Sequence, residues 1–173
     1  MGVTIHWQGK LLGEEAYTAL IRSVRKFAHE RNWPVTEIEG DVKQLLRVIG
    51  EQNVDYEGPT FGVVLWPHPE CEPVKLEFDE DLFTQEFCKT QFAGPKIHVA
   101  VVELLRAVAP YFAVIEVTDE GEFWGSSDEE QLARHFANIN ARLDELTAAD
   151  PTAKSPVLLP SGRLLDIANR KKH

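Results

Sequence analysis

Two short acidic segments of the chain hold the side chains best suited to metal binding or acid–base chemistry. One is the proline-rich stretch 67–73 and the other is the stretch 118–122. The metal-ligand candidates are one imidazole and three carboxylates: His68, Glu70, Glu72 and Asp119. Zn²⁺, Mn²⁺ and Mg²⁺ accept such ligands, so the sequence predicts a divalent-metal site if the two segments meet at one end of a sheet. A solvated loop and a solvated turn are the alternative.

The acid–base candidates are one imidazole and two carboxylates: His98, Glu120 and Glu122. His98 lies in a predicted helix over Lys96–Ala109, in which the polar side chains form one narrow stripe and His98 points away from it. A buried imidazole needs a hydrogen-bond partner. His98 is therefore interpreted as a core histidine bound to a carbonyl or carboxylate, or as an acid–base group.

The chain carries no P-loop, Rossmann, nucleophile-elbow or HExxH signature. His68 and Glu70 have the spacing of the His-x-Glu of a zinc deaminase, but no Pro-Cys-x-x-Cys follows them. Cys71 and Cys88 fit no metal or redox spacing and are expected to be free thiols of a reducing compartment. The sequence thus predicts no cofactor.

Composition limits the classes of partner. A net charge of −10 and a pI near 5.1 argue against a nucleic-acid backbone or an anionic membrane as the main partner, because both are negatively charged. The N-terminus has neither the basic nor the apolar region of a signal peptide, and no apolar run is long enough to span a bilayer. We therefore expect a cytoplasmic location.

Hydrophobic periodicity predicts both helices and strands. Apolar residues at three- and four-residue spacing predict helices from Gly13 to before Pro34, over Lys96–Ala109, and from a capping box at Ser127 to Ala149. Short alternating or β-branched runs predict strands: Val3–Gln8, Val35–Gly40, Val42–Ile49, Thr60–Trp66, Val74–Phe78 and Tyr111–Val117. The stretch Leu82–Phe92 fits either a strand or a loop.

These elements predict an α+β fold. The expected order is β-α-β-β-β-β-α-β-α, with a largely antiparallel or mixed sheet of five to six strands and three main helices packed on one face. A chain of 173 residues suits one domain, assigned to residues 1–150. Residues 151–173 form an extension rich in aliphatic side chains, expected to pack on its own domain or on a second subunit. A short helix is predicted over Ser161–Asn169.

The leading functional hypothesis is a binding or regulatory module, not an enzyme, that works through a surface as a homo-oligomer. A narrow apolar stripe on the last long helix, together with the C-terminal extension, is the predicted contact surface: Leu132, Phe136, Ile139, Leu143 and Leu146. The acidic charge would favour a basic partner. The alternatives are a small-molecule enzyme that uses loops 67–73 and 118–122, and a carrier with an apolar pocket between the sheet and the central helix.

Overall fold

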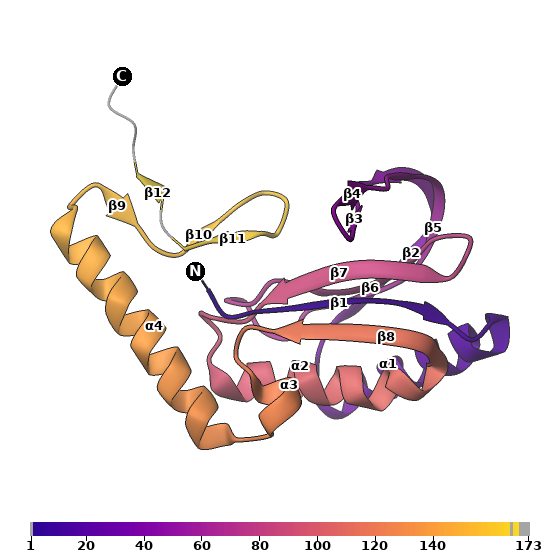
Figure 1. Ribbon diagram of the computed structural model, residues 1–173, viewed down its shortest axis with the longest axis horizontal. Coiled ribbons are helices and arrows are strands. Elements are labelled where there is room, and N and C mark those ends of the chain that lie inside the picture. Colours follow the sequence, from indigo (N-terminus) through magenta and orange to yellow (C-terminus); the bar gives the residue numbers. More distant parts are fainter. Residues whose placement is uncertain (1, 167, 170–173) are drawn as a thin grey trace.

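The computed structural model describes residues 2–166, 168 and 169 and shows an α+β protein with antiparallel sheets (Figure 1). The long strands are β1 (Thr4–Leu11), β2 (Val35–Leu45), β5 (Tyr56–Leu65), β6 (Val74–Phe78), β7 (Phe83–Lys89) and β8 (Phe112–Asp119). The helices are α1 (Glu14–Glu30), α2 (Pro95–Val108), the 3-10 turn η1 (Ala109–Tyr111), α3 (Phe123–Ser126) and α4 (Glu129–Ala149). Six two-residue strands complete the list: β3 (Val48–Ile49), β4 (Gln52–Asn53), β9 (Ala153–Lys154), β10 (Val157–Leu158), β11 (Leu164–Leu165) and β12 (Ala168–Asn169).

The long strands form two three-stranded sheets, with the orders β7-β1-β8 and β2-β5-β6. Every strand pair is antiparallel, which confirms the predicted α+β class. The two sheets meet where β6 turns into β7. Backbone hydrogen bonds join the two segments at both ends of this junction. The Asp79 N–H donates to the Phe83 carbonyl at 3.0 Å, and the Glu72 N–H donates to the Lys89 carbonyl at 3.1 Å.

Helices α1 and α2 cover one face of the sheets (Figure 1). The apolar stripe of α1 buries Leu20, Val24 and Ala28, as its three- and four-residue spacing predicts. Helix α2 begins at Pro95, which needs no N–H at the first helical position, and its length agrees with the prediction to within one residue at each end. Strand β1 contributes Trp7 to the core between these layers. Within the described residues, no helix has the length and hydropathy needed to cross a bilayer.

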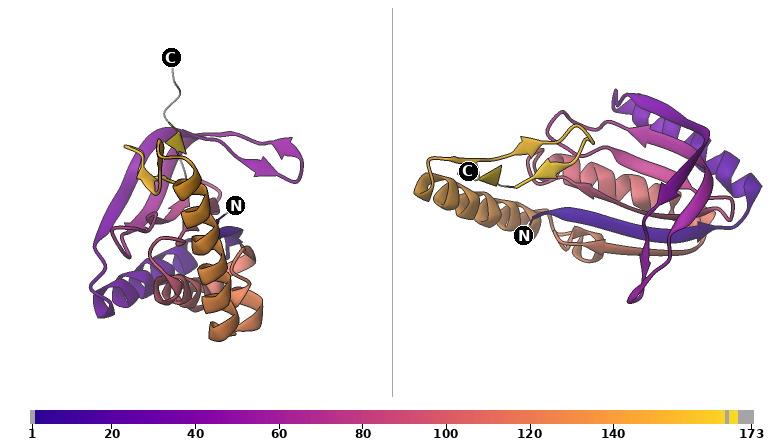
Figure 2. Two further views of the ribbon diagram at one scale, coloured as in Figure 1. Left: turned by 90° about the vertical axis from the view of Figure 1, so that its left-hand side faces the viewer. Right: turned by 90° about the horizontal axis from the view of Figure 1, so that it is seen from above.

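The opposite face carries a projecting β-hairpin. Strands β2 and β5 pair along most of their length, but the register shifts between Glu39 and Val42, next to Gly40 with φ of 77°. The paired strands bend here, and residues 46–55, including β3 and β4, extend over the open side of the strands (Figure 2). We call residues 46–55 the arm.

Helix α4 is packed at its beginning and exposed toward its end. Leu132 and Phe136 are buried, and Leu146 is 50% exposed. The hairpin that contains β10 and β11 lies on the open side of the sheet (Figure 1). The Leu164 N–H donates to a Glu72 carboxylate oxygen at 2.9 Å, and Lys89 Nζ lies 3.0 Å from Asp166 Oδ1. The described part of the extension therefore touches its own domain, while a contact with a second subunit stays a prediction.

Four local predictions differ from the structure. Six strands, not four, separate α1 from α2. The predicted strands Val35–Gly40 and Val42–Ile49 share β2, the arm adds β3 and β4, and the undecided stretch Leu82–Phe92 contains β7. The predicted strand Val42–Ile49 is broken into the end of β2 and β3. Helix α4 is capped by Asp128 rather than Ser127, since the Asp128 side chain accepts the Gln131 N–H. The short helix predicted over Ser161–Asn169 is wrong: its described residues contain β11, β12 and non-helical connections, with position 167 outside them.

Gly62 allows β5 and β6 to approach each other closely. Its φ is 145°, and a β-carbon would overlap the Leu76 carbonyl oxygen. We expect Gly62→Ala to lower the free energy of unfolding by about 2–4 kcal/mol, because neither backbone can yield without breaking the ladder. Gly125→Ala is the control, since a β-carbon there meets nothing within 4 Å. Equal urea midpoints for the two variants would contradict the prediction.

Candidate functional site

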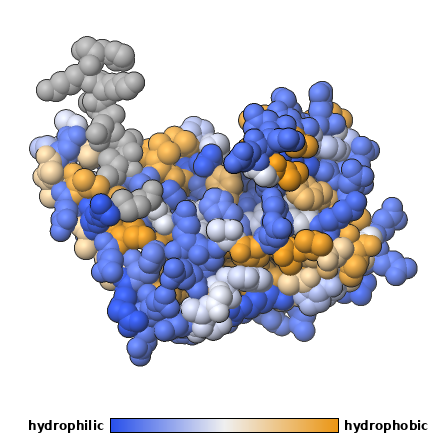
Figure 3. Space-filling model, in the orientation of Figure 1, coloured by the Kyte–Doolittle hydropathy of each residue, from blue (hydrophilic) through white to orange (hydrophobic). Residues whose placement is uncertain are grey.

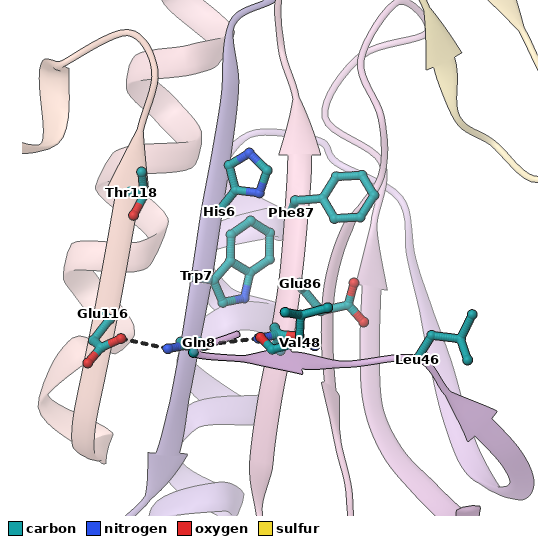
Figure 4. Close-up of a pocket in the computed structure, with 11 residues that line it drawn as sticks. His6, Trp7, Gln8, Leu46, Val48, Glu86, Phe87, Glu116 and Thr118 are labelled. Carbon is teal, nitrogen blue, oxygen red and sulfur yellow. Dashed lines mark hydrogen bonds between the residues drawn. The ribbon is translucent and has the colours of Figure 1, made fainter. Parts of the chain in front are cut away.

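A groove of about 440 Å³ lies between the arm and the open face of the strands (Figure 4). Strands β1, β7 and β8 form its floor, and the arm forms one side. Its lining combines polar and apolar residues in similar numbers: His6, Trp7, Gln8, Leu46, Val48, Gly50, Gln85, Glu86, Phe87, Glu116 and Thr118. A cavity of this size can hold a small ligand or part of a peptide.

A row of hydrogen-bonded side chains crosses the groove. Gln8 Nε2 donates to Glu116 Oε2 at 2.6 Å, and Gln85 Nε2 donates to Gln8 Oε1 at 2.8 Å. The Gln85 amide also pairs with the backbone of Val48, accepting its N–H at 3.0 Å and donating to its carbonyl at 2.6 Å. Gln85 therefore acts on the arm as the peptide group of a neighbouring strand would act, and it holds the arm above the sheet.

Arg47 anchors the base of the arm. Its guanidinium is 6% exposed and lies 2.5 Å from Asp79 Oδ2. Arg47 Nη2 also donates to the Phe83 carbonyl at 3.3 Å, and the guanidinium lies over the Tyr56 and Phe83 rings. Asp79 is fixed in turn, because its Oδ1 accepts the Phe83 N–H at 3.0 Å. A charge-assisted pair this well buried gives the arm one defined position.

Among the acidic side chains that line the groove, Glu86 is the one whose pKa is raised. Burial raises the pKa of its carboxyl to about 7, against the opposing effect of Lys75, while Glu77 raises it further and Arg47 and Lys43 lower it. No hydrogen bond to this carboxyl occurs among the described residues. A carboxyl whose pKa lies near neutral pH can exchange a proton with a ligand under ordinary conditions.

A smaller cavity of about 220 Å³ brings the two predicted acidic segments together. Glu72 and Glu120 both line it, next to His6 and Lys89. Each carboxylate is already bonded to the backbone: Glu72 Oε2 accepts the Lys89 N–H at 3.0 Å, and Glu120 Oε2 accepts the Thr4 N–H at 2.9 Å. Both carboxylates therefore stabilise strand ends. Glu72 is 3% exposed and uses both oxygens in this way, whereas the Glu120 side chain is 43% exposed and its Oε1 lies 4.0 Å from His6 Nε2.

His98 and Asp119 form a separate, buried pair. His98 Nε2 lies 3.0 Å from Asp119 Oδ1, and the two side chains are 0% and 2% exposed. His98 Nδ1 is 2.8 Å from the Thr90 hydroxyl. Burial alone would raise the pKa of Asp119, but His98 and the N–H groups of Trp124 and Gly121 outweigh it and lower that pKa. This geometry matches the interpretation of His98 as a core histidine with a carboxylate partner.

The other predicted site residues lie apart from the groove. His68 Nδ1 accepts the Glu70 N–H at 3.1 Å within one turn. Glu122 accepts a hydrogen bond from Gln131 Nε2 at 2.6 Å near the start of α4. In the part of the chain that the structure describes, no three His, Cys, Asp or Glu side chains are grouped as a metal site. The geometry thus brings Glu72 and Glu120 together and leaves His68, Glu70 and Glu122 elsewhere.

Comparisons of the chain with models of protein families, with curated proteins and with solved structures found no match. Function must therefore be argued from the site itself.

Sequence reasoning missed the groove, its lining residues Gln85 and Glu86, and Arg47, which anchors the arm. One signal was available, because Arg47 interrupts the apolar run Val42–Ile49, and an arginine within such a run needs a buried partner or a turn. Glu86 gave no signal, since a glutamate in a short amphipathic stretch is usually exposed.

Replacing Glu86 tests its raised pKa. The folded protein binds this proton more tightly than the unfolded chain, whose reference pKa is 4.5, so stability is lost as the pH rises from about 4.5 to about 7. Glu86→Gln stays neutral, and we expect it to be more stable than the wild type by about 1–3 kcal/mol at pH 8 and equal to it near pH 4. Urea unfolding at both pH values measures this. Exposed Glu51→Gln is the control, and a gain that does not depend on pH would contradict the prediction.

Removing the Arg47 guanidinium should release the arm. Arg47→Met leaves Asp79 buried without its cation, so we expect a loss of about 3 kcal/mol and faster hydrogen exchange at the Val48 N–H. The control is Arg25→Met, whose partner Glu37 is half exposed, and this change should cost less than about 1 kcal/mol. Unchanged exchange at Val48 would show that the arm is held by other contacts.

Proposed function

We propose that the protein is a binding module that recognises a basic protein partner through the arm and the adjoining groove. The observation that carries this proposal is a rigidly anchored arm with exposed aliphatic side chains. Leu46 is 79% exposed, Val48 56%, Ile49 40% and Val54 46%, and Val42 at the base of the arm is 72% exposed. Hydrophobic side chains gathered on one projecting hairpin are typical of a protein contact surface.

Charge supports a basic partner. Residues 37–57 and 77–81, which form the arm, its base and the neighbouring turn, contain ten carboxylates and two basic side chains. Their formal net charge of −8 compares with −10 for the whole chain. Figure 3 shows hydrophobic side chains on this lobe bordered by hydrophilic ones. An apolar centre with an acidic rim would both attract and orient a positively charged surface.

The anchoring of the arm favours binding. Arg47 and Gln85 fix the arm before any partner arrives, so little conformational entropy would be lost on association. The groove beneath the arm adds a pocket in which a partner side chain could reach Glu86, Gln8 and Phe87. The proposal therefore combines a preformed apolar contact with a polar pocket at its edge.

Self-association through α4 is a second, weaker part of the proposal. Leu132 and Phe136 are buried within the same chain, so these two residues of the predicted stripe cannot contact a partner. Leu146 and Leu158 are 50% and 61% exposed and would provide the remaining surface. A homo-oligomer in the cytoplasm would fit this assignment, and light scattering on the purified protein measures its size.

The arm is tested by replacing two of its side chains. Cross-linking of the tagged protein in the cells that produce it identifies the partner, and the two separately purified, uncross-linked proteins are then titrated by calorimetry at low and high salt. Leu46→Ser combined with Ile49→Ser should weaken binding by about 10- to 100-fold, because two apolar contacts are lost. The wild-type affinity should also fall as salt rises, because the acidic rim is screened.

The control replaces an exposed leucine that belongs to neither proposed contact surface. Leu12 is 66% exposed, and Leu12→Ser should leave the affinity unchanged. A partner with an acidic surface, or an arm variant that binds as tightly as the wild type, would refute the proposal.

A further inference from the structure

The thiols of Cys71 and Cys88 lie together below the surface. Their sulfur atoms are 3.6 Å apart, although Cys71 belongs to the connection before β6 and Cys88 to β7. Both are free and buried, with exposures of 5% for Cys71 and 0% for Cys88. Two cysteines distant in sequence are therefore in van der Waals contact.

The backbone holds this contact in place. The next residues along each segment are joined twice: the Glu72 N–H donates to the Lys89 carbonyl at 3.1 Å, and the Lys89 N–H donates to Glu72 Oε2 at 3.0 Å. The Cys88 thiol also donates to the Glu72 carbonyl at 3.1 Å. A disulfide needs a sulfur–sulfur distance of about 2 Å, so closure brings the two sulfur atoms closer by roughly 1.5 Å.

We propose that Cys71 and Cys88 are an oxidisable dithiol that a hydroperoxide converts to an intramolecular disulfide, stapling the connection 67–73 to β7. This inference does not depend on the proposed binding function. The predicted reduced state of the two thiols is its resting form.

The two thiols have different roles in the oxidation. Cys71 keeps the only residual exposure of the pair, so its thiolate attacks the peroxide oxygen, giving a sulfenic acid and releasing hydroxide, which is protonated to water. The neighbouring Cys71 thiol and burial raise the pKa of Cys88, which keeps Cys88 protonated until the sulfenic acid forms beside it. The Cys88 sulfur then attacks the Cys71 sulfur and a second water leaves. Two thiols and hydrogen peroxide thus give one disulfide and two waters.

The disulfide between Cys71 and Cys88 would restrict the hairpin that contains β10 and β11, through Glu72. This residue is 3% exposed, follows Cys71 directly, and accepts the Leu164 N–H with Oε1 and the Lys89 N–H with Oε2. Fixing Cys71 to Cys88 restricts the backbone on which this carboxylate sits. The oxidised protein should therefore hold residues 159–166 more firmly than the reduced protein.

The test uses the full-length wild-type protein, reduced and then treated with hydrogen peroxide while folded. After denaturation and alkylation, intact mass should show the loss of two hydrogens and no alkylated thiol, and dithiothreitol should restore two alkylatable thiols. Closing a loop of this length should raise Tm by roughly 6–12 °C. Two free thiols after treatment, a gain of two or three oxygens, or a disulfide between chains would overturn the proposal.

Single variants locate the chemistry. Cys71→Ser and Cys88→Ser should each lack the intramolecular disulfide and the rise in Tm. Because Cys88 is fully buried, its variant can lose stability, and the wild-type mass measurement then decides alone. Hydrogen exchange at the Leu164 N–H should slow on oxidation. An unchanged rate in protein whose disulfide has formed would overturn the link to the hairpin.

Discussion

The buried contact between His98 and Asp119 joins two strands of one sheet to two helices. The His98 ring also meets the Thr90 hydroxyl, and the Asp119 carboxylate accepts the N–H groups of Gly121 and Trp124. One pair of side chains thus connects the first turn of α2, the end of β7, the end of β8 and the start of α3. In a buried network each member depends on the others, because removal of one leaves the next without a partner. Polar contacts between buried side chains, in addition to apolar packing, therefore hold the ends of β7 and β8 to helices α2 and α3.

A second buried ion pair, between Arg47 and Asp79, does something different. It fixes a segment that contributes little to the core, since most aliphatic side chains of the arm remain exposed. Burying a guanidinium costs desolvation energy, and exposing aliphatic groups forgoes hydrophobic stabilisation. Neither the burial of the guanidinium nor the exposure of the aliphatic side chains stabilises the chain on its own. Both are consistent with an arm that keeps one conformation for a partner that covers it.

The sequence could predict the parts of the fold that follow from local periodicity. Helices α1 and α2 and strands β1, β6 and β8 were expected within a few residues, because their apolar spacing matches the face that they bury. The arm could not be predicted in the same way. Most aliphatic side chains of the stretch Val42–Ile49 face solvent, and only the Arg47 side chain in it is buried. The spacing of apolar residues along a chain does not show which of them the fold will cover. Strand β7 stayed undecided because its pattern mixes groove-facing and core-facing side chains.

The candidate site was less accessible to sequence reasoning, for a physical reason. Acidic segments are visible in a sequence, but the partners of each carboxylate are set by residues far along the chain. Glu72 looked available, yet backbone N–H groups from Lys89 and Leu164 occupy both of its oxygens, and the Thr4 N–H binds one oxygen of Glu120. A pKa shift depends on what the rest of the fold places around a group, as desolvation does for a glutamate in the middle of β7. Carboxylates that stand out in a sequence can therefore already be bonded to the backbone of the same chain, as Glu72 is, whereas a carboxyl with a raised pKa, such as that of Glu86, can lie within an ordinary strand.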